Sequence, residues 1–511
     1  MDDGVGTKKR VLPLRVTQGQ NDKSVANDKG VVHDESVVND KTLAARAQRA
    51  GNTPAFYTES SMSYAAAIEA LNALAPELHT APGRARRKFS LAEIGVLLAD
   101  MGNPQNAFKS LLIAGTNGKG STASTLASIL RASGMRTGLY TSPHLERPNE
   151  RIRVEGEEIS DADFAAHYFA VSEAADALVA AGKLAQTPSF FETLTAMAFR
   201  HFAQAGIEVA VLEVGMGGRL DATNIVDPLV SVITDISLDH TEWLGSTIGA
   251  IAREKAGILR QNGVLVTLPQ HPEANQAIGE AATELGVRGV NAAGYVPAWG
   301  PASEERQGRP YRLQVMGREI EIASPLAGAH QQRNVALAIA TAVELAEHHG
   351  FPVSAQSIAA GVRDTRWPGR LEVLRTGDVT WILDVAHNPA GAWALRAGLR
   401  PYLDGEAAAG RPATLVFSCL RDKPIAEMAQ ILFPLFDRVV MAPIASPRAA
   451  RMDELMAAAE ATGTAAEAGA SVDAALQQAR PEGCGIVVVS GSVYLVGDAR
   501  AILLGHRSGV R

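Results

Sequence analysis

The strongest constraint on the fold is one short stretch, IAGTNGKGST at residues 113–122. An apolar run leads into a loop that holds three glycines and a lysine, and a run of good helix formers follows from Thr122 to Ser133. Glycines let backbone N–H groups approach phosphate oxygens, and a helix N-terminus adds positive potential. The order of strand, glycine loop, lysine, hydroxyl and helix therefore predicts a phosphate-binding loop. The simpler alternative is a glycine-rich turn that binds nothing.

The spacing of this loop differs from the common GxxxxGK[ST] phosphate loop, in which the hydroxyl directly follows the lysine. Here Gly120 lies between Lys119 and Ser121. Lys119 can reach the terminal phosphates as a point charge, and Ser121 can bond either a phosphate or a magnesium-bound water. The extra glycine needs a structural explanation.

From about residue 60 the chain alternates between apolar and helical segments, which predicts an α/β fold. We expect strands at 110–114, 209–214, 229–236 and 263–268, a hairpin at 314–322 and a long helix at 330–349. Strands that are apolar throughout indicate a parallel sheet covered on both faces. After TRWPGR a second α/β run begins, with strands expected within 381–386, 412–418, 436–443 and 485–492.

We therefore predict a P-loop ATPase-type parallel-sheet domain at 59–367 and a smaller, Rossmann-like, doubly wound C-terminal domain at 368–511. Ligands bind beyond the carboxyl ends of the strands in such sheets, so the cleft between the domains is the expected active site. Residues 1–58 repeat Asn-Asp-Lys and contain no aromatic residue before Phe56. We expect a disordered, dispensable tail there; the alternative is a partner-binding arm.

Composition disfavours several classes of protein. The formal charge of −7 disfavours a general nucleic-acid binder, and the two cysteines have no metal-ligand spacing and suit a reducing cytoplasm. No apolar run approaches the roughly 20 residues that span a bilayer, and the first residues lack the apolar core of a signal peptide. We expect a cytoplasmic protein that binds neither membranes nor nucleic acid.

Three further residues carry chemistry if they meet the loop. Glu213 ends an apolar strand, where a carboxylate is unfavourable unless it is paired or bound to a metal; otherwise it is a solvated strand-end acid. His240 follows another such strand, and the alternative is an ordinary loop histidine. Lys255 lies on a helix, where a solvated lysine is the common case. Mg²⁺ prefers oxygen ligands, so an imidazole ligand is unusual.

Eight motifs occur in the order found in folylpolyglutamate synthase and dihydrofolate synthase, which belong to the Mur ligase superfamily. They are GTNGKGS, TSPHL, LEVGMGGRLDATN, LDHTEWLG, REKAGI, GAHQQRN, WPGR and LDVAHNP. Nearly all of residues 60–511 thus resembles this family, and the GKGS spacing resembles folate ligases, whereas Mur ligases place the hydroxyl next to the lysine.

The resemblance implies a role for each matching residue. Asn117, Gly118, Lys119, Gly120 and Ser121 would hold the ATP phosphates, with Asn334, Arg370 and Asp384 on the adenine, a phosphate and the ribose. Ser142 and Glu213 would bind one Mg²⁺ and His240 a second, with K⁺ as a further candidate cofactor. Lys255 matches the lysine that is carbamylated in the superfamily. The pteroate contacts would come from Ser189, Phe190, Phe191, Glu192, Leu220, Asp221 and Ala222, although Thr is commoner than Ser at 189 and Phe191 fits a core position equally well.

The implied reaction is ATP-dependent amide formation between L-glutamate and 7,8-dihydropteroate, reduced folates, or both, and we favour both. An acyl phosphate forms, and either a nearby carboxylate or His387 accepts the proton of the amine. The family resemblance implies a monomer with small-molecule substrates. The rival interpretations are a Mur-type ligase with another carboxylate substrate and an ATP-hydrolysing switch.

Overall fold

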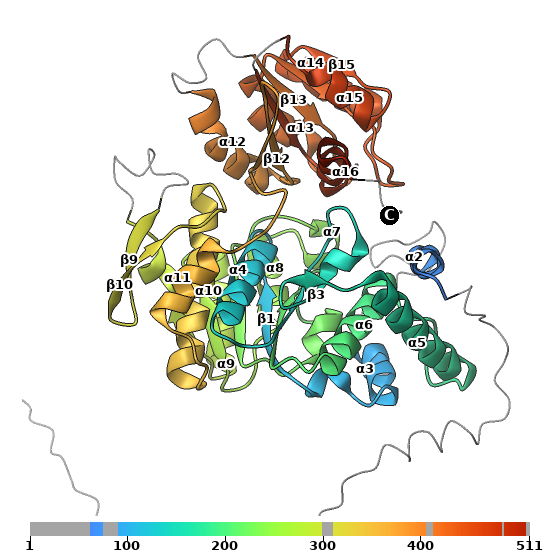
Figure 1. Cartoon of the computed structure of the whole chain (residues 1–511), viewed down its shortest axis with the longest axis vertical. Coiled ribbons are helices and arrows are strands. Elements are labelled where there is room, and N and C mark those ends of the chain that lie inside the picture. The colour runs from blue at the N-terminus through green and yellow to red at the C-terminus, as the bar shows by residue number, and fades with distance from the viewer. Residues whose placement is uncertain (1–61, 75–89, 299–309, 405–411, 483–484, 507–511) are drawn as a thin grey trace, which may run out of the picture. The chain divides into compact units, whose positions relative to one another are not determined.

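The structure is a computed structural model that describes residues 62–74, 90–298, 310–404, 412–482 and 485–506. The expected tail at 1–58 lies outside these residues. Two β-sheets organise the described chain, one in an N-terminal and one in a C-terminal domain (Figure 1). The predicted α/β class is confirmed, while the domain boundaries at 59, 367 and 368 stay predictions.

The N-terminal sheet has eight strands in the order β4-β3-β2-β5-β1-β6-β7-β8. Their bounds are β1 Lys109–Ala114, β2 Thr137–Tyr140, β3 Ile152–Val154, β4 Glu157–Glu158, β5 Val209–Glu213, β6 Val230–Ile233, β7 Val264–Thr267 and β8 Arg288–Asn291. In this order the strands from β2 through β5, β1, β6 and β7 to β8 are parallel, as the apolar runs predict. At one edge β3 pairs antiparallel with β2, and β4 pairs antiparallel with β3. The central strand β1 has β5 and β6 as its neighbours.

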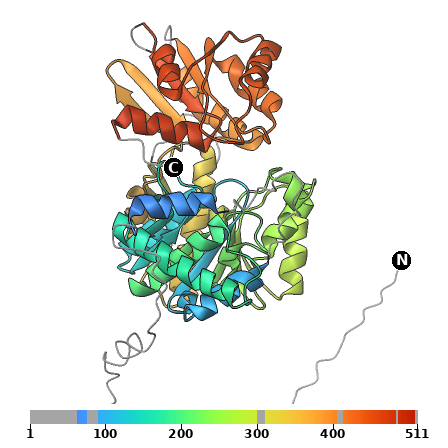
Figure 2. The same ribbon diagram turned by 90° about the vertical axis from the view of Figure 1, so that its right-hand side faces the viewer.

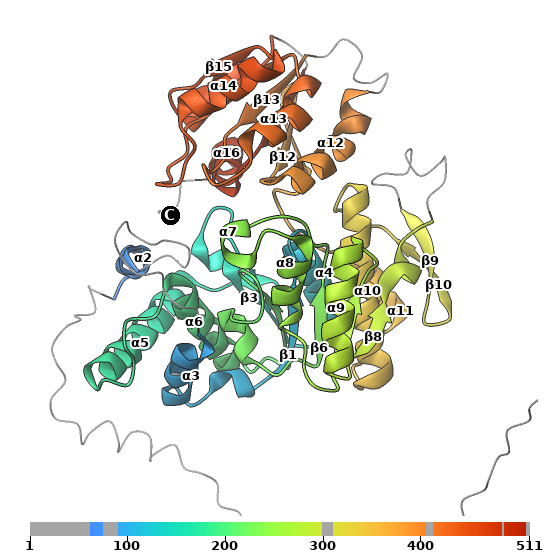
Figure 3. The ribbon, with the colours of Figure 1, turned by 180° about the vertical axis from the view of Figure 1, so that it is seen from behind.

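Both faces of this sheet are buried, because successive residues of a strand point to opposite sides. In β1, Leu111 and Ile113 join one hydrophobic cluster, with α4, α10 and α11, whereas Leu112 and Ala114 join the other, with α2, α3, α5, α6, α8 and α9. The helix bounds are α2 Tyr64–Ala73, α3 Leu91–Asp100, α4 Lys119–Ala132, α5 Asp161–Ala180, α6 Phe190–Gln204, α7 Thr241–Leu244, α8 Ile248–Ala256, α9 Pro272–Glu284, α10 Ala329–His348 and α11 Ala355–Arg363. Figures 1 and 3 show these two helix layers from opposite sides.

Two local features complete this domain. Tyr64 of α2 meets Phe164 of α5 edge-to-face, with ring centroids 5.5 Å apart, so α2 lies against the α5 layer (Figure 2). The expected hairpin is confirmed as β9 Tyr311–Val315 paired antiparallel with β10 Arg318–Ile322. Its two turn residues, Met316 and Gly317, both have positive φ, as a two-residue hairpin turn requires.

Helix α4 is buried along most of its length, from Gly120 to Leu130, although five of these residues are Ser or Thr. Its neighbour α11 approaches it closely, because a Cβ at Gly361 would lie 2.3 Å from the Cα of Ile129. Small side chains thus let α4 pack against the sheet and against other helices.

The C-terminal sheet has six strands in the order β11-β12-β16-β13-β14-β15. Their bounds are β11 Glu372–Thr376, β12 Val379–Asp384, β13 Ala413–Phe417, β14 Arg438–Met441, β15 Ala466–Ala468 and β16 Gly485–Ser490. All pairs are parallel except β11 with β12, so an antiparallel edge is added to the expected doubly wound sheet. Helices α12 Pro389–Leu403, α13 Ile425–Leu432 and α14 Met452–Thr462 pack on one face, and α15 Val472–Ala479 and α16 Val493–Leu504 on the other. Within the described ranges, no helix combines the length and apolar character that crossing a membrane requires.

Candidate functional site

A cavity of about 350 Å³, which we call the nucleotide cavity because the predicted phosphate loop lines it, lies at the carboxyl ends of the central strands of the N-terminal sheet. Because β5, β1 and β6 are adjacent and parallel, the segments that follow them meet at one edge. The sequence-predicted residues that line the cavity are Asn117, Gly118, Lys119, Gly120, Ser121, Ser142, Glu213, His240, Lys255, Asn334, Arg370, Asp384 and His387. Residues from both domains therefore share one site, as the sequence predicts.

The phosphate loop begins its helix earlier than the run of helix formers indicates. Gly118 has φ +86° and precedes α4, which starts at Lys119 rather than Thr122. The first-turn N–H groups of α4 are thereby the ones that can face an anion. Gly118 also lies against α10, because a Cβ there would lie 2.1 Å from the Oδ1 of Asn334. Asn334 in turn donates to Gln331, at 2.9 Å.

The extra glycine of the loop has a steric explanation. A Cβ at Gly120 would lie 2.5 Å from Cζ2 of Trp367 and 3.2 Å from a carboxylate oxygen of Glu213. Trp367 belongs to the TRWPGR segment, so this segment packs directly on the phosphate loop. Only glycine leaves room for both neighbours.

Glu213 ends β5 and is 3% exposed, which rules out the solvated strand-end acid. Its carboxylate accepts the backbone N–H of Ser142 at 3.0 Å. Burial raises the pKa of Glu213, and Lys119 opposes this rise only in part. Among the described residues, no lysine or arginine forms an ion pair with it. A buried carboxylate of this kind fits a bound cation.

His240 precedes α7 in a left-handed backbone conformation, with φ +49°, which is uncommon outside glycine. It lines the cavity, half-buried, one residue after Asp239. Burial is the main cause that lowers the pKa of His240 to about 4. The neutral imidazole that results is the form that can ligate a metal.

Lys255 lies on α8 and is 4% exposed, so the solvated helical lysine is also ruled out. Its ammonium nitrogen donates to the carbonyl of Gly115 at 2.7 Å. Burial, and secondly the charge of Lys119, lowers the pKa of Lys255 to about 7. A substantial share of its side chain is therefore a neutral amine near neutral pH, which is the nucleophilic form.

The C-terminal domain supplies Arg370, Asp384 and His387. Arg370 stacks on Trp367, with its guanidinium carbon 5.8 Å from the ring centroid. Asp384 is buried and accepts the N–H groups of Leu371 and Ala386, both at 2.9 Å. Burial raises the pKa of Asp384 and lowers those of Arg370 and His387.

A set of polar contacts, which we call the inner bridge, crosses between the domains beside this cavity. Lys423 donates to Oδ1 of Asp239 at 2.6 Å, and both side chains are less than a tenth exposed. Asn388 donates to Oδ2 of Asp239 and to Oδ1 of Asn117, each at 3.1 Å. Burial alone would raise the pKa of Asp239, but the neighbouring His240 and Lys423 outweigh burial and lower it.

The seven residues predicted to contact pteroate do not line the nucleotide cavity. Ser189 and Glu192 form a capping box at the start of α6, and Asp221 caps the 3₁₀ turn Ala222–Ile225. Phe191 is in the hydrophobic core and packs against Gly215, as its core alternative allows. Phe190 and Leu220 are partly exposed, and Phe190 lies under the guanidinium of Arg151 at 5.2 Å. A pteroate role for these residues stays a prediction.

Sequence reasoning missed several residues of the site. His330 and Gln331 line the cavity, and their signal was present in the GAHQQRN motif. Asp239 likewise belongs to a quoted motif, LDHTEWLG. Lys423, which reaches the site from the loop before α13, lies in none of the motifs.

Comparisons with known proteins identify the family of this chain. The Mur ligase middle domain matches residues 113–342, and the Mur ligase glutamate ligase domain matches residues 369–493. A dihydrofolate synthase/folylpolyglutamate synthase of Mycobacterium tuberculosis is 38% identical over 451 residues, which cover 81% of this chain and 90% of the relative. The chain belongs to the dihydrofolate synthase/folylpolyglutamate synthase family.

The match covers different shares of other proteins of this family. A probable bifunctional folylpolyglutamate synthase/dihydropteroate synthase of Haloferax volcanii is 37% identical over 412 residues, and the match covers 79% of this chain but only 47% of that relative. The solved structure of E. coli FolC in complex with DHPP and ADP has a TM-score of 0.73 at 30% identity and covers 88% of this chain and 99% of that one. The chain therefore has the fold of this family along most of its described length.

Members of this family are ATP-dependent ligases, and the nucleotide cavity has the parts that such an enzyme needs. No group of three or more His, Cys, Asp or Glu side chains in the described part of the chain is arranged to hold a metal by itself.

Proposed function

We propose that this enzyme joins L-glutamate to 7,8-dihydropteroate, and also to the γ-carboxylate of reduced folates, through an acyl phosphate. The observation that carries the proposal is the shared cavity: the phosphate loop, Glu213 and Lys255 of one domain line it together with Arg370, Asp384 and His387 of the other. The partly exposed Phe190 and Leu220 supply the candidate pteroate contacts.

The residues present fit Mg²⁺. Glu213 and Ser142 would hold one ion, because a buried carboxylate without an ion-pair partner needs a positive neighbour. His240, whose lowered pKa keeps it neutral, would hold a second ion. When bound, Mg²⁺ neutralises phosphate oxygens. K⁺ is a further candidate at the same site.

The reaction begins with two anions that must meet. A carboxylate oxygen of the folate attacks the γ-phosphorus of ATP, the bond from that phosphorus to the bridging oxygen breaks, and ADP leaves. Lys119, Arg370 and the first-turn N–H groups of α4 hold the phosphates, while Asn334 and Asp384 hold the adenine and the ribose.

The second step forms the amide. The neutral amine of L-glutamate attacks the acyl carbon, and inorganic phosphate leaves. His387 lines the cavity with Nδ1 2.9 Å from the carbonyl of Val385 and Nε2 3.7 Å from Asp239. Its lowered pKa leaves it neutral, so it is our candidate to accept the proton of the incoming ammonium.

Lys255 is our candidate for carbamylation. Its amine is deprotonated in part at pH 7 and can attack CO₂, which turns a buried cation into an anion beside the proposed metals. The Lys255→Ala variant should bind ADP with nearly unchanged affinity, as calorimetry would show, but lose ligation. The exposed Lys183 supplies the matched control, Lys183→Ala. Full ligase activity in Lys255→Ala contradicts the assignment.

The function is tested by phosphate release with MgATP and L-glutamate, with 7,8-dihydropteroate in one tube and tetrahydrofolate in another. Turnover with both supports the bifunctional proposal. Turnover with one assigns a single activity and contradicts the other. Turnover with neither, beside intact ADP binding, points to a Mur-type ligase with another carboxylate substrate.

A further inference from the structure

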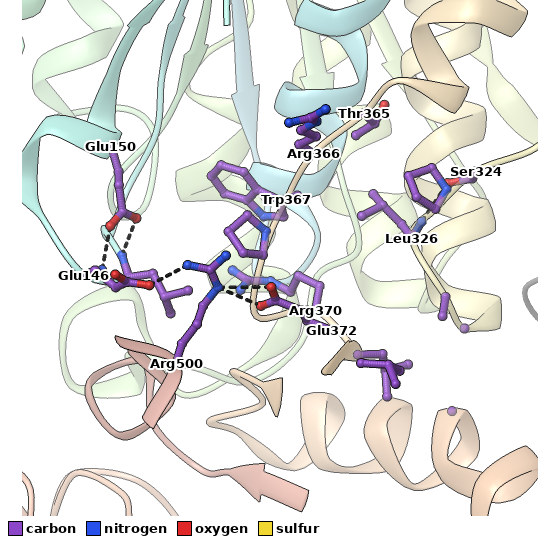
Figure 4. Close-up of a pocket in the computed structure, with 18 of the residues that line it drawn as sticks. Glu146, Glu150, Ser324, Leu326, Thr365, Arg366, Trp367, Arg370, Glu372 and Arg500 are labelled. Carbon is purple, nitrogen blue, oxygen red and sulfur yellow. Dashed lines mark hydrogen bonds and ion pairs between the residues drawn. The ribbon is translucent and has the colours of Figure 1, made fainter. Parts of the chain in front are cut away.

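Arg500 on α16 joins three segments that are far apart in the sequence (Figure 4). Its Nε lies 3.0 Å from both carboxylate oxygens of Glu372, and its Nη1 lies 2.5 Å from Oε1 of Glu146. His506 adds a contact, with Nδ1 3.0 Å from Oε2 of Glu146. We call these residues the outer clasp. It borders a second cavity, of about 1090 Å³, that is distinct from the nucleotide cavity but shares Arg370 with it.

Glu146 belongs to a loop with a fixed backbone. The carboxylate of Glu150 accepts the N–H groups of Leu145, Glu146 and Arg147 at 2.6–2.7 Å. Four residues before Glu146, the same loop carries Ser142, whose N–H is bonded to Glu213. The position of Glu146 therefore influences the position of Ser142, because a short and hydrogen-bonded stretch of backbone connects them.

Glu372 holds the other segment. It starts β11, and its Oε2 also accepts the N–H of Gly369 at 2.9 Å. Gly369 lies between Trp367, which packs on Gly120, and Arg370, which lines the nucleotide cavity. Arg500 thus touches, through one carboxylate each, the two segments that bring Ser142 and Arg370 to the nucleotide.

We infer that Arg500 is a positioning residue, which fixes the 142–150 loop and the 367–370 segment relative to each other and so places Ser142 and Arg370 at the bound nucleotide. Arg500 does not line the nucleotide cavity. Only a guanidinium can hold both carboxylates in this way, because its planar fork presents several donors at fixed angles. This inference rests on the proposed function for its kinetic readout, but not for its structural one.

The test compares Arg500→Ala with Glu146→Gln, which weakens the contacts of Arg500 and His506 with Glu146 but leaves the contact of Arg500 with Glu372 intact. Hydrogen–deuterium exchange of the full chain should become about tenfold faster within 142–150 in both variants, and within 367–370 in Arg500→Ala alone. In Arg500→Ala the KM for MgATP should rise and kcat should fall, together about tenfold in kcat/KM. The two changes share the Arg500–Glu146 contact, so their effects should not add, and the double variant should be worse than Arg500→Ala by no more than the loss of the His506–Glu146 contact.

Arg438→Ala is the matched control. Arg438 lies 3.5 Å from Glu467 within the C-terminal domain, far from the loop in sequence. If Arg500→Ala matches this control in exchange, ADP affinity and kinetics, the inference is wrong. If the wild type shows no ligase turnover while Arg500→Ala still speeds exchange and weakens ADP binding, the proposed function fails and the positioning role stands.

Discussion

The inner bridge and the outer clasp connect the same two domains with charged side chains, but they are built differently. In the inner bridge one ammonium meets one carboxylate, with 6% of Lys423 and 9% of Asp239 exposed. In the outer clasp one guanidinium is shared by two carboxylates, with 20% of Arg500, 15% of Glu146 and 19% of Glu372 exposed. If one partner of the inner bridge is lost, the other charge stays buried and unpaired, which is unfavourable. The charges of the outer clasp are more exposed, so water can solvate them when a partner is lost. We conclude that the inner bridge contributes mainly to stability and the outer clasp mainly to position.

The largest expected effect is at the inner bridge. Lys423→Met leaves the buried Asp239 carboxylate without its cation, and this should lower the free energy of unfolding by about 3–5 kcal/mol. Denaturant unfolding measures the change. The double variant with Asp239→Asn should lose less than the two single changes together. Additive losses would show that the two side chains do not act as a pair.

The packing of Trp367 on Gly120 tests whether the phosphate loop depends on the 367–370 segment. Gly120→Ala forces a Cβ into Trp367 and Glu213, which should weaken ADP binding by about 10- to 100-fold in calorimetry. Gly279 supplies the control, because a Cβ there meets nothing within 4 Å and its φ is not positive. Equal ADP affinity in Gly120→Ala and Gly279→Ala contradicts our explanation of the extra glycine.

Acid provides a comparison that the outer clasp should not influence. His167 on α5 is 3% exposed and lies 3.1 Å from His201 of α6, and burial, then Arg200, lowers its pKa to about 4. The unfolded chain takes up this proton near pH 6.5 and the folded chain does not, so stability falls as the pH drops from 6.5 towards 4. The loss is about 2 kcal/mol at pH 5.

The control for this pH effect is His167→Gln, which lacks the titrating group. The acid-dependent loss should shrink by about 2 kcal/mol at pH 5 in that variant and persist unchanged in Arg500→Ala. His240, His330 and His387, whose pKa values are also lowered, still contribute in His167→Gln, and Lys423→Met is no control here because Lys423 helps to lower the pKa of His240 and of His387. A smaller loss in Arg500→Ala would mean that the outer clasp, rather than α5 and α6, responds to acid.

The smallest expected effect is the stability change at the outer clasp. Arg500→Ala should lower the free energy of unfolding by about 1 kcal/mol, because partly exposed ion pairs are weak. Raising NaCl from about 0.05 to 0.5 M should reduce this difference, since salt screens accessible charges. The loss in Lys423→Met should change little with salt. The same salt response in both variants would remove the distinction between the two contacts.

The sequence predicted those parts of the site that follow from local pattern. Glu213, the phosphate loop and His240 each follow an apolar strand, and parallel neighbours place such residues together. Lys423 and Asp239 are 184 residues apart, and no periodicity or spacing relates them. The same holds for Arg500 and Glu146, which are 354 residues apart, and for the contact between Trp367 and Gly120. The edge strands β3, β4 and β11 were missed because short, half-exposed segments carry little apolar signal.

Helix α4 has a consequence for how this enzyme can diversify. Its buried run of small residues and its backbone contact with Gly361 leave no space to shift the phosphate loop. Substitutions that enlarge a side chain of α4 should therefore be tolerated poorly, because neither the sheet nor α11 leaves room for them. Residues that face the phosphate loop from other segments are not under this constraint.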